Sequence, residues 1–383
     1  DPPLGLFRRA IGYQSQGEKL IMASPTPLPG LLDIAPYAGG EAEIEGFDKV
    51  IKLASNEGAF GPSPKVRAVL EAALDNFHRY PDGDCTKIRE AIADKYGYPV
   101  QNIMCGAGSD ELIGLIARCY AAAGDEIITC AHGFAMYPIY VKQVGADLVV
   151  APETNITVNV DAILERVSAR TKVVFVANPN NPTGTYIPKS EVVRLRTGLP
   201  DHVLLVLDGA YSEFVDRDDY TNGAEMVAAS DNVVMLRTFS KIYGMGGLRL
   251  GWAYCPDEVA DVINKTRSPF NVSYPAQIAG LAALEDDAFL EHARAHNIQW
   301  RQWTSDEVKK LGLEVPDSVC NFVLVWFPDE PGRSAEDANQ HLKSRGIIAR
   351  RMAGYGLPDA LRISIGLEDE MRAVVDALKE FLD

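Results

Sequence analysis

The stretch from Thr238 to Arg249 combines a lysine, hydroxyl groups and an arginine in a pattern that suggests a reactive site. It reads Thr-Phe-Ser-Lys-Ile-Tyr-Gly-Met-Gly-Gly-Leu-Arg, so Lys241 follows Ser240 and is itself followed by glycines and by Arg249. A lysine that forms a covalent imine needs a lowered pKa, which supplies free amine, and neighbours that hold an anionic group nearby. Ser240 offers a hydroxyl donor and Arg249 a fixed cation. The alternative is a glycine-rich loop whose lysine and arginine face water.

Short apolar runs flank this stretch and alternate with helical patterns from about residue 100 to residue 275. Several runs carry branched residues without polar alternation, as strands buried on both faces do. This alternation predicts an α/β fold with a doubly wound, mostly parallel, seven-stranded sheet. The expected strands are Asn102–Cys105, Glu126–Cys130, Asp147–Val150, Lys172–Ala177, Val203–Asp208, Val233–Arg237 and Leu250–Tyr254.

The pattern differs at both ends of the chain. Residues 1–38 are punctuated by Pro and Gly and predict an extended N-terminal arm. After residue 275 a long helical stretch, strand-like runs and a closing amphipathic helix predict a smaller α+β domain. We therefore expect an arm (residues 1–38), a large cofactor-binding domain (residues 65–275) and a small domain (residues 39–64 plus 276–383). Further expected elements are helices over Cys85–Tyr96, Ser109–Ala122, Ala276–Leu311 and Ala335–Ser344, and strands over Asn321–Phe327, Ile347–Arg350 and Leu361–Ile365.

Composition excludes several classes of function. The net charge of −16 argues against a nucleic-acid or anionic-membrane partner, since phosphate backbones favour clustered Lys and Arg. No apolar run approaches the roughly 20 residues that span a bilayer. The six cysteines have no C-x-x-C spacing, and the six histidines have no metal-ligand spacing. These features predict a cytoplasmic protein without a structural metal.

In doubly wound sheets, ligands bind beyond the carboxyl ends of the strands. The first expected strand ends at Gly106-Ala-Gly108-Ser109-Asp110, where glycines before a helix expose backbone N–H groups to an anion. A plain turn with a helix cap explains this run as well. The second strand is followed by Phe134, an aromatic that stacks on a planar ring or fills a loop.

Two later strand ends carry polar side chains. Asn178–Gly184 contains two Asn-Pro pairs, which make a stiff loop that aims Asn181 as a donor. Asp208 closes an apolar run, where an acid is costly to bury without a partner. The alternatives for Asp208 are a helix cap and the partner of a protonated pyridine nitrogen. In the second case Tyr211 could reach a phenolate on the same ring.

Together the strand ends supply an anion cradle, a stacking aromatic, an amide donor, a buried acid, a tyrosine, an imine-forming lysine and a cation. These are the requirements of pyridoxal 5′-phosphate, whose protonated pyridine ring acts as an electron sink. The sequence therefore predicts this cofactor.

With these residues assembled, the chain resembles the fold-type I, aspartate-aminotransferase-like pyridoxal-phosphate enzymes. Among them it resembles the histidinol-phosphate aminotransferase family most closely. The similarity runs from Leu31 to the C terminus. It is carried by Leu32–Tyr37, Ser55–Glu57, Gly61–Pro64, Tyr80–Gly83, Asn178–Gly184, Asp208–Tyr211, Thr238–Arg249, Gly354–Pro358 and Leu361–Gly366.

The resemblance implies a role for each matching residue. Lys241 is the Schiff-base lysine and the acid/base of the proton shift, and Asp208 pairs with the pyridine nitrogen. Tyr211 and Asn181 bind the 3′ oxygen of the ring, and Phe134 stacks on it. The residues that match the phosphate cup are Gly108, Ser109, Asp110, Thr238, Ser240 and Arg249. Those that match the substrate-binding residues are Tyr37, Asn181, Arg350 and Arg362. In the family the two arginines bind acidic groups of the substrate.

The resemblance also implies a homodimer with active sites at the interface, and a ping-pong transfer of the amino group of histidinol phosphate to 2-oxoglutarate. Three departures bear on this expectation. Phe60 stands where many relatives place a tyrosine that reaches the partner's cofactor phosphate, Gly209 replaces a common Glu, and Arg351 replaces a common Pro. An aromatic amino acid aminotransferase and a decarboxylase of a phosphorylated amino acid remain as alternatives. A non-enzymatic binding module is disfavoured by the intact Lys241.

Overall fold

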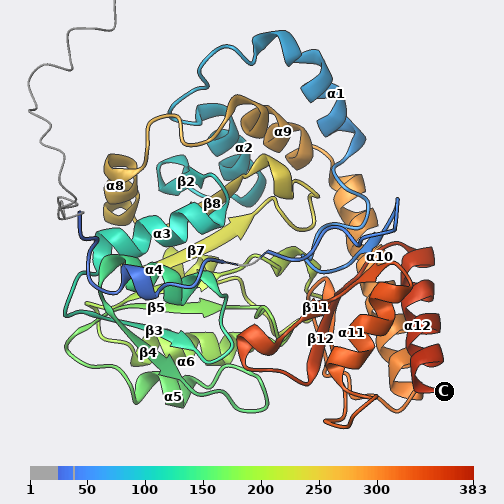
Figure 1. Cartoon of the computed structure of the whole chain (residues 1–383). Helices are drawn as coiled ribbons and strands as arrows, with labels where there is room; N and C mark the ends of the chain where they lie inside the picture. The colour runs from blue at the N-terminus through green and yellow to red at the C-terminus, as the bar shows by residue number, and fades with distance from the viewer. Residues whose placement is uncertain (1–24, 38) are drawn as a thin grey trace, which may run out of the picture.

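Seven strands in the middle of the chain form one sheet (Figure 1) in the computed structural model, which describes residues 25–37 and 39–383. The strand order is β2-β8-β7-β6-β5-β3-β4, and β8 alone runs antiparallel to its neighbours. The predicted seven-stranded, mostly parallel sheet is confirmed. Its strands are β2 (Ile103–Gly106), β3 (Glu126–Cys130), β4 (Asp147–Ala151), β5 (Thr171–Ala177), β6 (Leu204–Asp208), β7 (Val233–Thr238) and β8 (Gly251–Tyr254).

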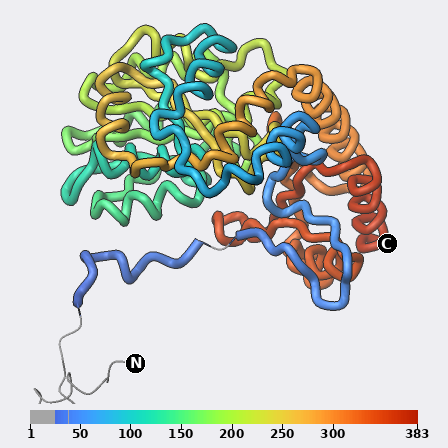
Figure 2. The backbone as a smooth tube through the Cα atoms, turned by 90° about the horizontal axis from the view of Figure 1, so that it is seen from above, coloured from blue at the N-terminus to red at the C-terminus, as the bar shows by residue number. Residues whose placement is uncertain are grey.

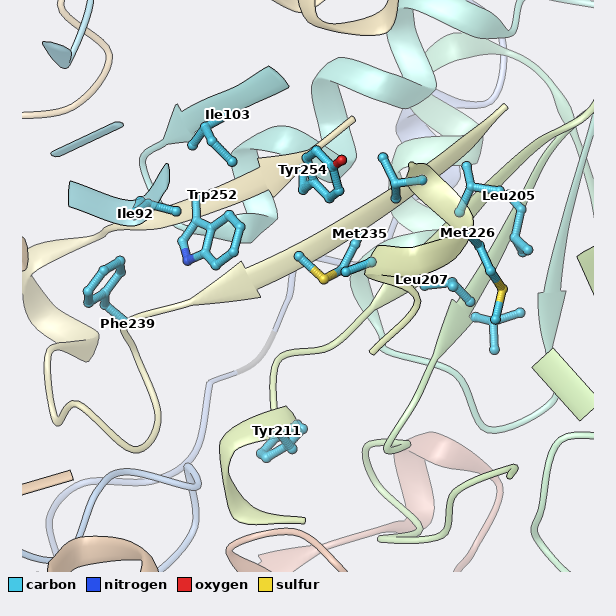
Figure 3. Packing of buried hydrophobic residues seen from close by; sticks show 14 of the residues in the cluster. Ile92, Ile103, Leu205, Leu207, Tyr211, Met226, Met235, Phe239, Trp252 and Tyr254 are labelled. Carbon is cyan, nitrogen blue, oxygen red and sulfur yellow. The ribbon is translucent and has the colours of Figure 1, made fainter. Parts of the chain in front are cut away.

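Both faces of this sheet are apolar, because its strands are largely unbroken apolar runs and successive side chains of a strand point to opposite sides. In β6, Leu205 and Leu207 join one hydrophobic cluster, whereas Leu204 and Val206 join another on the opposite face. Figure 3 shows Leu205 and Leu207 together with Met235 of β7. An unbroken apolar run is therefore the pattern of a strand covered on both sides.

Helices cover each face. The cluster of Leu204 and Val206 is closed by α3 (Ser109–Tyr120), α4 (Met136–Val144) and α8 (Asp257–Thr266). Of these, only α3 was predicted with a residue range. The opposite face is covered by α1 (Pro64–Ala72), α2 (Thr86–Tyr96), α5 (Val160–Leu164), α6 (Lys189–Gly198), α7 (Ala224–Val227) and α9 (Tyr274–Leu284). The fold is thus doubly wound, as predicted.

The C-terminal part of the chain lies beside the large sheet (Figure 1). Strands β11 (Arg350–Arg351), β12 (Ala360–Ser364) and β9 (Phe322–Trp326) form an antiparallel sheet in that order. The short strand β1 (Ile51–Lys52) pairs with β10 (Ile347–Ile348), which ties residues near 50 to this part of the fold. We keep the division into residues 65–275 and residues 39–64 plus 276–383 as a proposal. The helices here are α10 (Asp287–Lys310), α11 (Ala335–Ser344) and α12 (Glu368–Leu382).

The expectation of one helical stretch from Ala276 to Leu311 was wrong, because α9 and α10 are separate helices. Asp286 lies between them with φ −110° and ψ 64°, outside the helical region. Its carboxylate accepts a hydrogen bond from the Ser63 hydroxyl and lies 3.6 Å from Lys65 Nζ. The break between α9 and α10 thus coincides with contacts to a segment more than 200 residues away in the sequence. A local sequence pattern cannot predict such contacts.

The predicted N-terminal arm is described over residues 25–37, where it contains a short 3₁₀ turn over Leu31–Asp33. Figure 2 shows this segment at the outside of the fold. Residues 1–24 and 38 lie outside the described residues. In the described part of the chain, no helix has the length and apolar character needed to cross a membrane. The cytoplasmic location stays a prediction.

Candidate active site

A cavity of about 320 Å³ opens where β5, β6 and β7 end and α3 begins. It brings together most of the predicted site residues from segments far apart in the sequence. Gly108, Arg350 and Arg362 are the predicted residues that do not line it directly. The lining consists of Tyr37, Ser109, Asp110, Phe134, Met136, Ala177, Pro179, Asn181, Asp208, Ala210, Tyr211, Thr238, Ser240, Lys241 and Arg249.

Lys241 follows the end of β7 and places its amine at the wall of the cavity. Lys241 Nζ donates to the Ser55 carbonyl oxygen at 3.4 Å and lies 5.7 Å from the centre of the Tyr211 ring. Burial of the amine, followed by the positive charge of Arg362, lowers the pKa of Lys241 to about 8. At pH 7 roughly one molecule in ten then carries the free amine. This is the lowered pKa that a nucleophilic lysine needs.

Asp208 ends β6 with its carboxylate buried at the cavity floor. Asp208 Oδ1 accepts from the Ala210 N–H at 3.1 Å, and Oδ2 accepts from the Tyr137 hydroxyl at 2.9 Å. Burial raises the pKa of Asp208. The capping alternative is wrong, because the next helical turn begins only at Ser212, with Tyr211 at its N-cap. Tyr137 was not predicted as a functional residue.

Tyr211 is held by Asn56, a second residue that the sequence analysis did not single out. Asn56 Nδ2 donates to the Tyr211 hydroxyl at 2.9 Å. Asn56 is buried and has φ +55°, an uncommon conformation for a non-glycine residue. Its N–H donates to Ser364 Oγ at 2.8 Å, and its carbonyl oxygen accepts from Asn321 Nδ2 at 3.0 Å. Since Asn56 donates to Tyr211, the hydroxyl hydrogen of Tyr211 is left for another acceptor. The only sequence signal was the Ser55–Glu57 run within the family resemblance.

The mouth of the cavity forms a cup for an anion. Arg249 adopts φ +57°, and its guanidinium donates to Ser240 Oγ at 3.3 Å and to the Ala107 carbonyl oxygen at 3.4 Å. The Thr238 hydroxyl donates to Ser240 Oγ at 3.0 Å. Gly108 precedes α3 with φ +85°, and any side chain there would collide with the Arg249 guanidinium. The backbone N–H groups at the start of α3 add a partial positive charge.

Arg362 projects from β12 and is buried beside the cavity. Its guanidinium donates to Asn181 Oδ1 and, at 2.9 Å, to the Ala54 carbonyl oxygen. It also lies 5.4 Å from the centre of the Phe322 ring. Because Asn181 Oδ1 is engaged by Arg362, Asn181 Nδ2 is the group that it offers as a donor. Arg362 thus acts on both Asn181 and Lys241.

Arg350 lines an adjoining cavity of about 420 Å³ instead of the central one. Its guanidinium donates to the Gly39 carbonyl oxygen. Lys142 and Tyr355 also line this second cavity, and Tyr37 lines both. Arg350 and Arg362 are therefore opposite each other on the paired strands β11 and β12, but Arg350 lines the adjoining cavity, and Tyr37 lines both spaces.

Two of the three departures have local explanations. Arg351 forms an ion pair with Glu336 of α11, so it ties β11 to that helix. At Gly209, an added Cβ would lie 3.1 Å from the Leu236 carbonyl oxygen and would collide with Ser212 Oγ. A glutamate at position 209 would therefore require the Ser212 hydroxyl to move and the Leu236 carbonyl oxygen to shift slightly.

The third departure, Phe60, packs its ring against α10. The centre of the Phe60 ring lies 4.7 Å from that of His292 and 4.6 Å from that of His296. These contacts are all within one chain. A phenyl ring supplies no hydroxyl donor to a phosphate.

The sheet order and the strand-end cavity with its lysine define an aminotransferase, and residues 48–378 match the family described as aminotransferase class I and II. The chain is 55% identical over 361 residues to histidinol-phosphate aminotransferase of Paramagnetospirillum magneticum, which covers 94% of this chain and 99% of that relative. It is 54% identical to histidinol-phosphate aminotransferase of Rhodospirillum centenum, with the same coverage. The chain belongs to the histidinol-phosphate aminotransferase family, as the resemblance predicted.

Solved structures agree with this assignment. The crystal structure of histidinol-phosphate aminotransferase from Sinorhizobium meliloti in complex with pyridoxal-5′-phosphate superposes with a TM-score of 0.86. Its sequence identity is 30%, and the match covers 94% of this chain and 98% of that one. Aspartate aminotransferase from Thermus thermophilus, at 22% identity and a TM-score of 0.76, shares the fold.

Proposed function

We propose that this aminotransferase uses pyridoxal 5′-phosphate to move an amino group between histidinol phosphate and 2-oxoglutarate by a ping-pong mechanism. The observation that carries the proposal is the arrangement around one cavity of the Lys241 amine, the buried Asp208 carboxylate and the Arg249 cup. The names of the most similar relatives support the choice of donor. The donor and acceptor pair remains part of the proposal.

The residues of the cavity fit the cofactor. The cup at Gly108 leaves no room for a side chain beside Arg249 and suits a phosphate group. Asp208 keeps its carboxylate toward the cavity floor, where a protonated pyridine nitrogen would compensate its charge. Tyr211 and Asn181 each have a donor left for the ring oxygen, and Phe134 lines the wall. When bound, pyridoxal phosphate supplies the aldehyde that takes up the amino group and the ring that accepts electrons from the α-carbon.

Lys241 moves the proton in this proposal. Its amine is partly free at neutral pH because burial and the charge of Arg362 lower its pKa to about 8. An acidic group of the substrate that pairs with Arg362 would offset that charge and so raise the basicity of Lys241. Binding of the substrate thereby prepares Lys241 to take the proton from the α-carbon of the donor and to return it at the other end of the shift.

The two arginines support a phosphorylated donor. Guanidinium groups bind dianions through paired hydrogen bonds. Arg362 reaches the central cavity through Asn181, Arg350 lines the adjoining cavity, and Tyr37 lies at the wall of both. Arg362 Nε is buried and has no partner among the residues that the structure describes, so it keeps one donor for a ligand.

The substrate is tested by measuring kcat/KM for histidinol phosphate and for phenylalanine in the wild type and in Arg350→Ala. Loss of one phosphate contact should lower kcat/KM for histidinol phosphate by about 10- to 100-fold and change that for phenylalanine much less. Equal losses would refute the phosphate site. A wild-type preference for phenylalanine would favour an aromatic aminotransferase. Carbon dioxide release from a phospho-amino acid without a 2-oxo acid would indicate a decarboxylase.

We also propose that the chain forms a homodimer through the side of the molecule that carries α1 and α9. Large apolar side chains are exposed there, among them Leu74 at 62% and Tyr80 at 83%. The Tyr80 ring stacks on Phe270 with centroids 4.7 Å apart, so the exposed rings form one patch. Patches of this kind mark protein interfaces. Sedimentation should give twice the mass of one chain, and Leu74→Asp with Tyr80→Asp should shift it toward one. A monomeric wild type would refute the proposal.

A further inference from the structure

Tyr137 connects two of the residues that face the cofactor site. It lies in the first turn of α4 with 1% of its surface exposed, and its hydroxyl donates to Asp208 Oδ2 at 2.9 Å. Its ring stacks on Phe175 of β5, with centroids 5.0 Å apart and an interplanar angle of 11°. The same ring and that of Phe134 meet edge to face, with centroids 5.7 Å apart and an interplanar angle of 87°. One side chain therefore contacts both the acid at the cavity floor and the aromatic at its wall.

The hydrogen of the Tyr137 hydroxyl has a fixed destination. Burial raises the pKa of Tyr137 well above its usual value, so the phenol stays protonated. A tyrosine hydroxyl has a single hydrogen to donate, and it points to Asp208. The other oxygen of Asp208 receives the Ala210 N–H at 3.1 Å. A donor on each oxygen fixes the plane of the carboxylate.

These two donors leave the carboxylate with capacity for another. An ionised carboxylate accepts about four hydrogen bonds, of which the protein supplies two. Hydrogen bonds to the ionised form stabilise it relative to the neutral acid. Removing the Tyr137 hydroxyl would leave one oxygen free to rotate and would weaken the charged form in a buried site.

We propose that Tyr137 is a positioning residue, whose hydroxyl orients the Asp208 carboxylate toward the pyridine nitrogen of the cofactor. The proposal rests on the proposed function, because that function places a pyridine ring against Asp208. A purely structural Tyr137 would fill the space between Phe175 and Phe134 and would act on any ring equally. The two roles therefore differ in whether the effect of the hydroxyl depends on the ring nitrogen.

The test is the affinity of the cofactor-free protein for two ligands. One is pyridoxamine 5′-phosphate, which makes no covalent bond with Lys241, and the other is its 1-deaza analogue, in which C–H replaces the ring nitrogen. The wild type should bind the nitrogen-containing ligand more tightly. In Tyr137→Phe this preference should fall by about 10- to 100-fold, the range for one hydrogen bond to a charged group, while the Kd of the deaza analogue changes little.

Tyr140→Phe is the matched control, because it removes a hydroxyl from the same helix that interacts electrostatically with Asp110, whereas the Asp208 oxygens accept from Tyr137 and Ala210. It should leave the preference unchanged. In Asp208→Asn the preference itself should disappear, and adding Tyr137→Phe should change nothing further.

An unchanged preference in Tyr137→Phe, or an equal loss of affinity for both ligands, would overturn this proposal and leave the proposed function standing. A wild-type protein that binds neither ligand would overturn both. Because the preference is a ratio within one variant, a general loss of stability cancels from it.

Discussion

Replacing Arg362 by glutamine should raise the pKa of Lys241. Burial is the largest cause of the lowered pKa of that lysine, and the charge of Arg362 is the next. Glutamine removes the charge but keeps an amide that can donate to the Ala54 carbonyl oxygen. Burial persists in the variant, so the pKa should move from about 8 toward, but not beyond, the ordinary value of 10.5.

The size of the effect follows from the fraction of free amine. With a pKa of about 8, roughly one lysine in ten is unprotonated at pH 7, whereas a pKa of 10.5 leaves roughly one in 3,000. Covalent capture of an aldehyde by Lys241 requires the free amine. Capture at pH 7 should therefore slow in Arg362→Gln by a factor that cannot exceed roughly 300.

The assay mixes cofactor-free protein with pyridoxal 5′-phosphate and follows covalent capture by absorbance from pH 6 to pH 10. The wild-type rate should rise with a midpoint near pH 8. Arg362→Gln should show a higher midpoint and approach the wild-type rate at high pH. Arg350→Gln is the control, because the groups that most affect the pKa of Lys241, besides burial, are Arg362, Glu57, Arg249 and Asp208. Equal midpoints for wild type and Arg362→Gln would refute the reasoning, as would a wild-type midpoint near 10.5.

Three further predictions follow from individual contacts. Asn56→Ala should weaken cofactor binding and destabilise the protein by about 1–3 kcal/mol, because alanine is strained at φ +55° and cannot donate to Tyr211. Asn56→Gly also removes the donor but adopts this φ without strain, so comparing the two variants in denaturant unfolding separates the effect of backbone strain from that of the lost hydrogen bond. Gly108→Ala should weaken binding of pyridoxal phosphate far more than that of pyridoxal, since the added methyl group would displace the Arg249 guanidinium from the anion cup. Equal losses of affinity for the two ligands would contradict the assignment of the cup as the phosphate site. In the cofactor-free protein the pKa of Lys241 is lower in the folded state, about 8, than the ordinary value of 10.5, so the unfolded state binds more protons between these pH values. The free energy of unfolding should therefore rise between pH 8 and 10.5 by up to about 1.4 kcal/mol per pH unit. Unfolding measurements of Lys241→Met across that range should lack this contribution.

Much of the fold could be predicted because its signals are local. The strands β5, β6 and β7 are apolar on both faces, and strands of this kind can be recognised in the sequence as runs of apolar residues such as Val203–Asp208. Parallel strands end at one edge of a sheet, so residues that follow separate runs could be expected to meet there. The break at Asp286 escaped prediction, because its partners Ser63 and Lys65 come from a distant segment.

The amino-acid sequence alone was enough to name the groups that carry the chemistry: an amine, an acid at the end of an apolar run, an anion cradle and two arginines. Tertiary packing sets how these groups act on one another. Tyr137 and Asp208, which are in contact, are 71 positions apart in the sequence, and Arg362 and Asn181 are 181 positions apart. No periodic pattern in the sequence links such distant pairs. Tertiary packing also places Arg350 in an adjoining cavity. The pKa of Lys241 depends on burial and on the charge of Arg362, and both arise only when the two parts of the chain pack together.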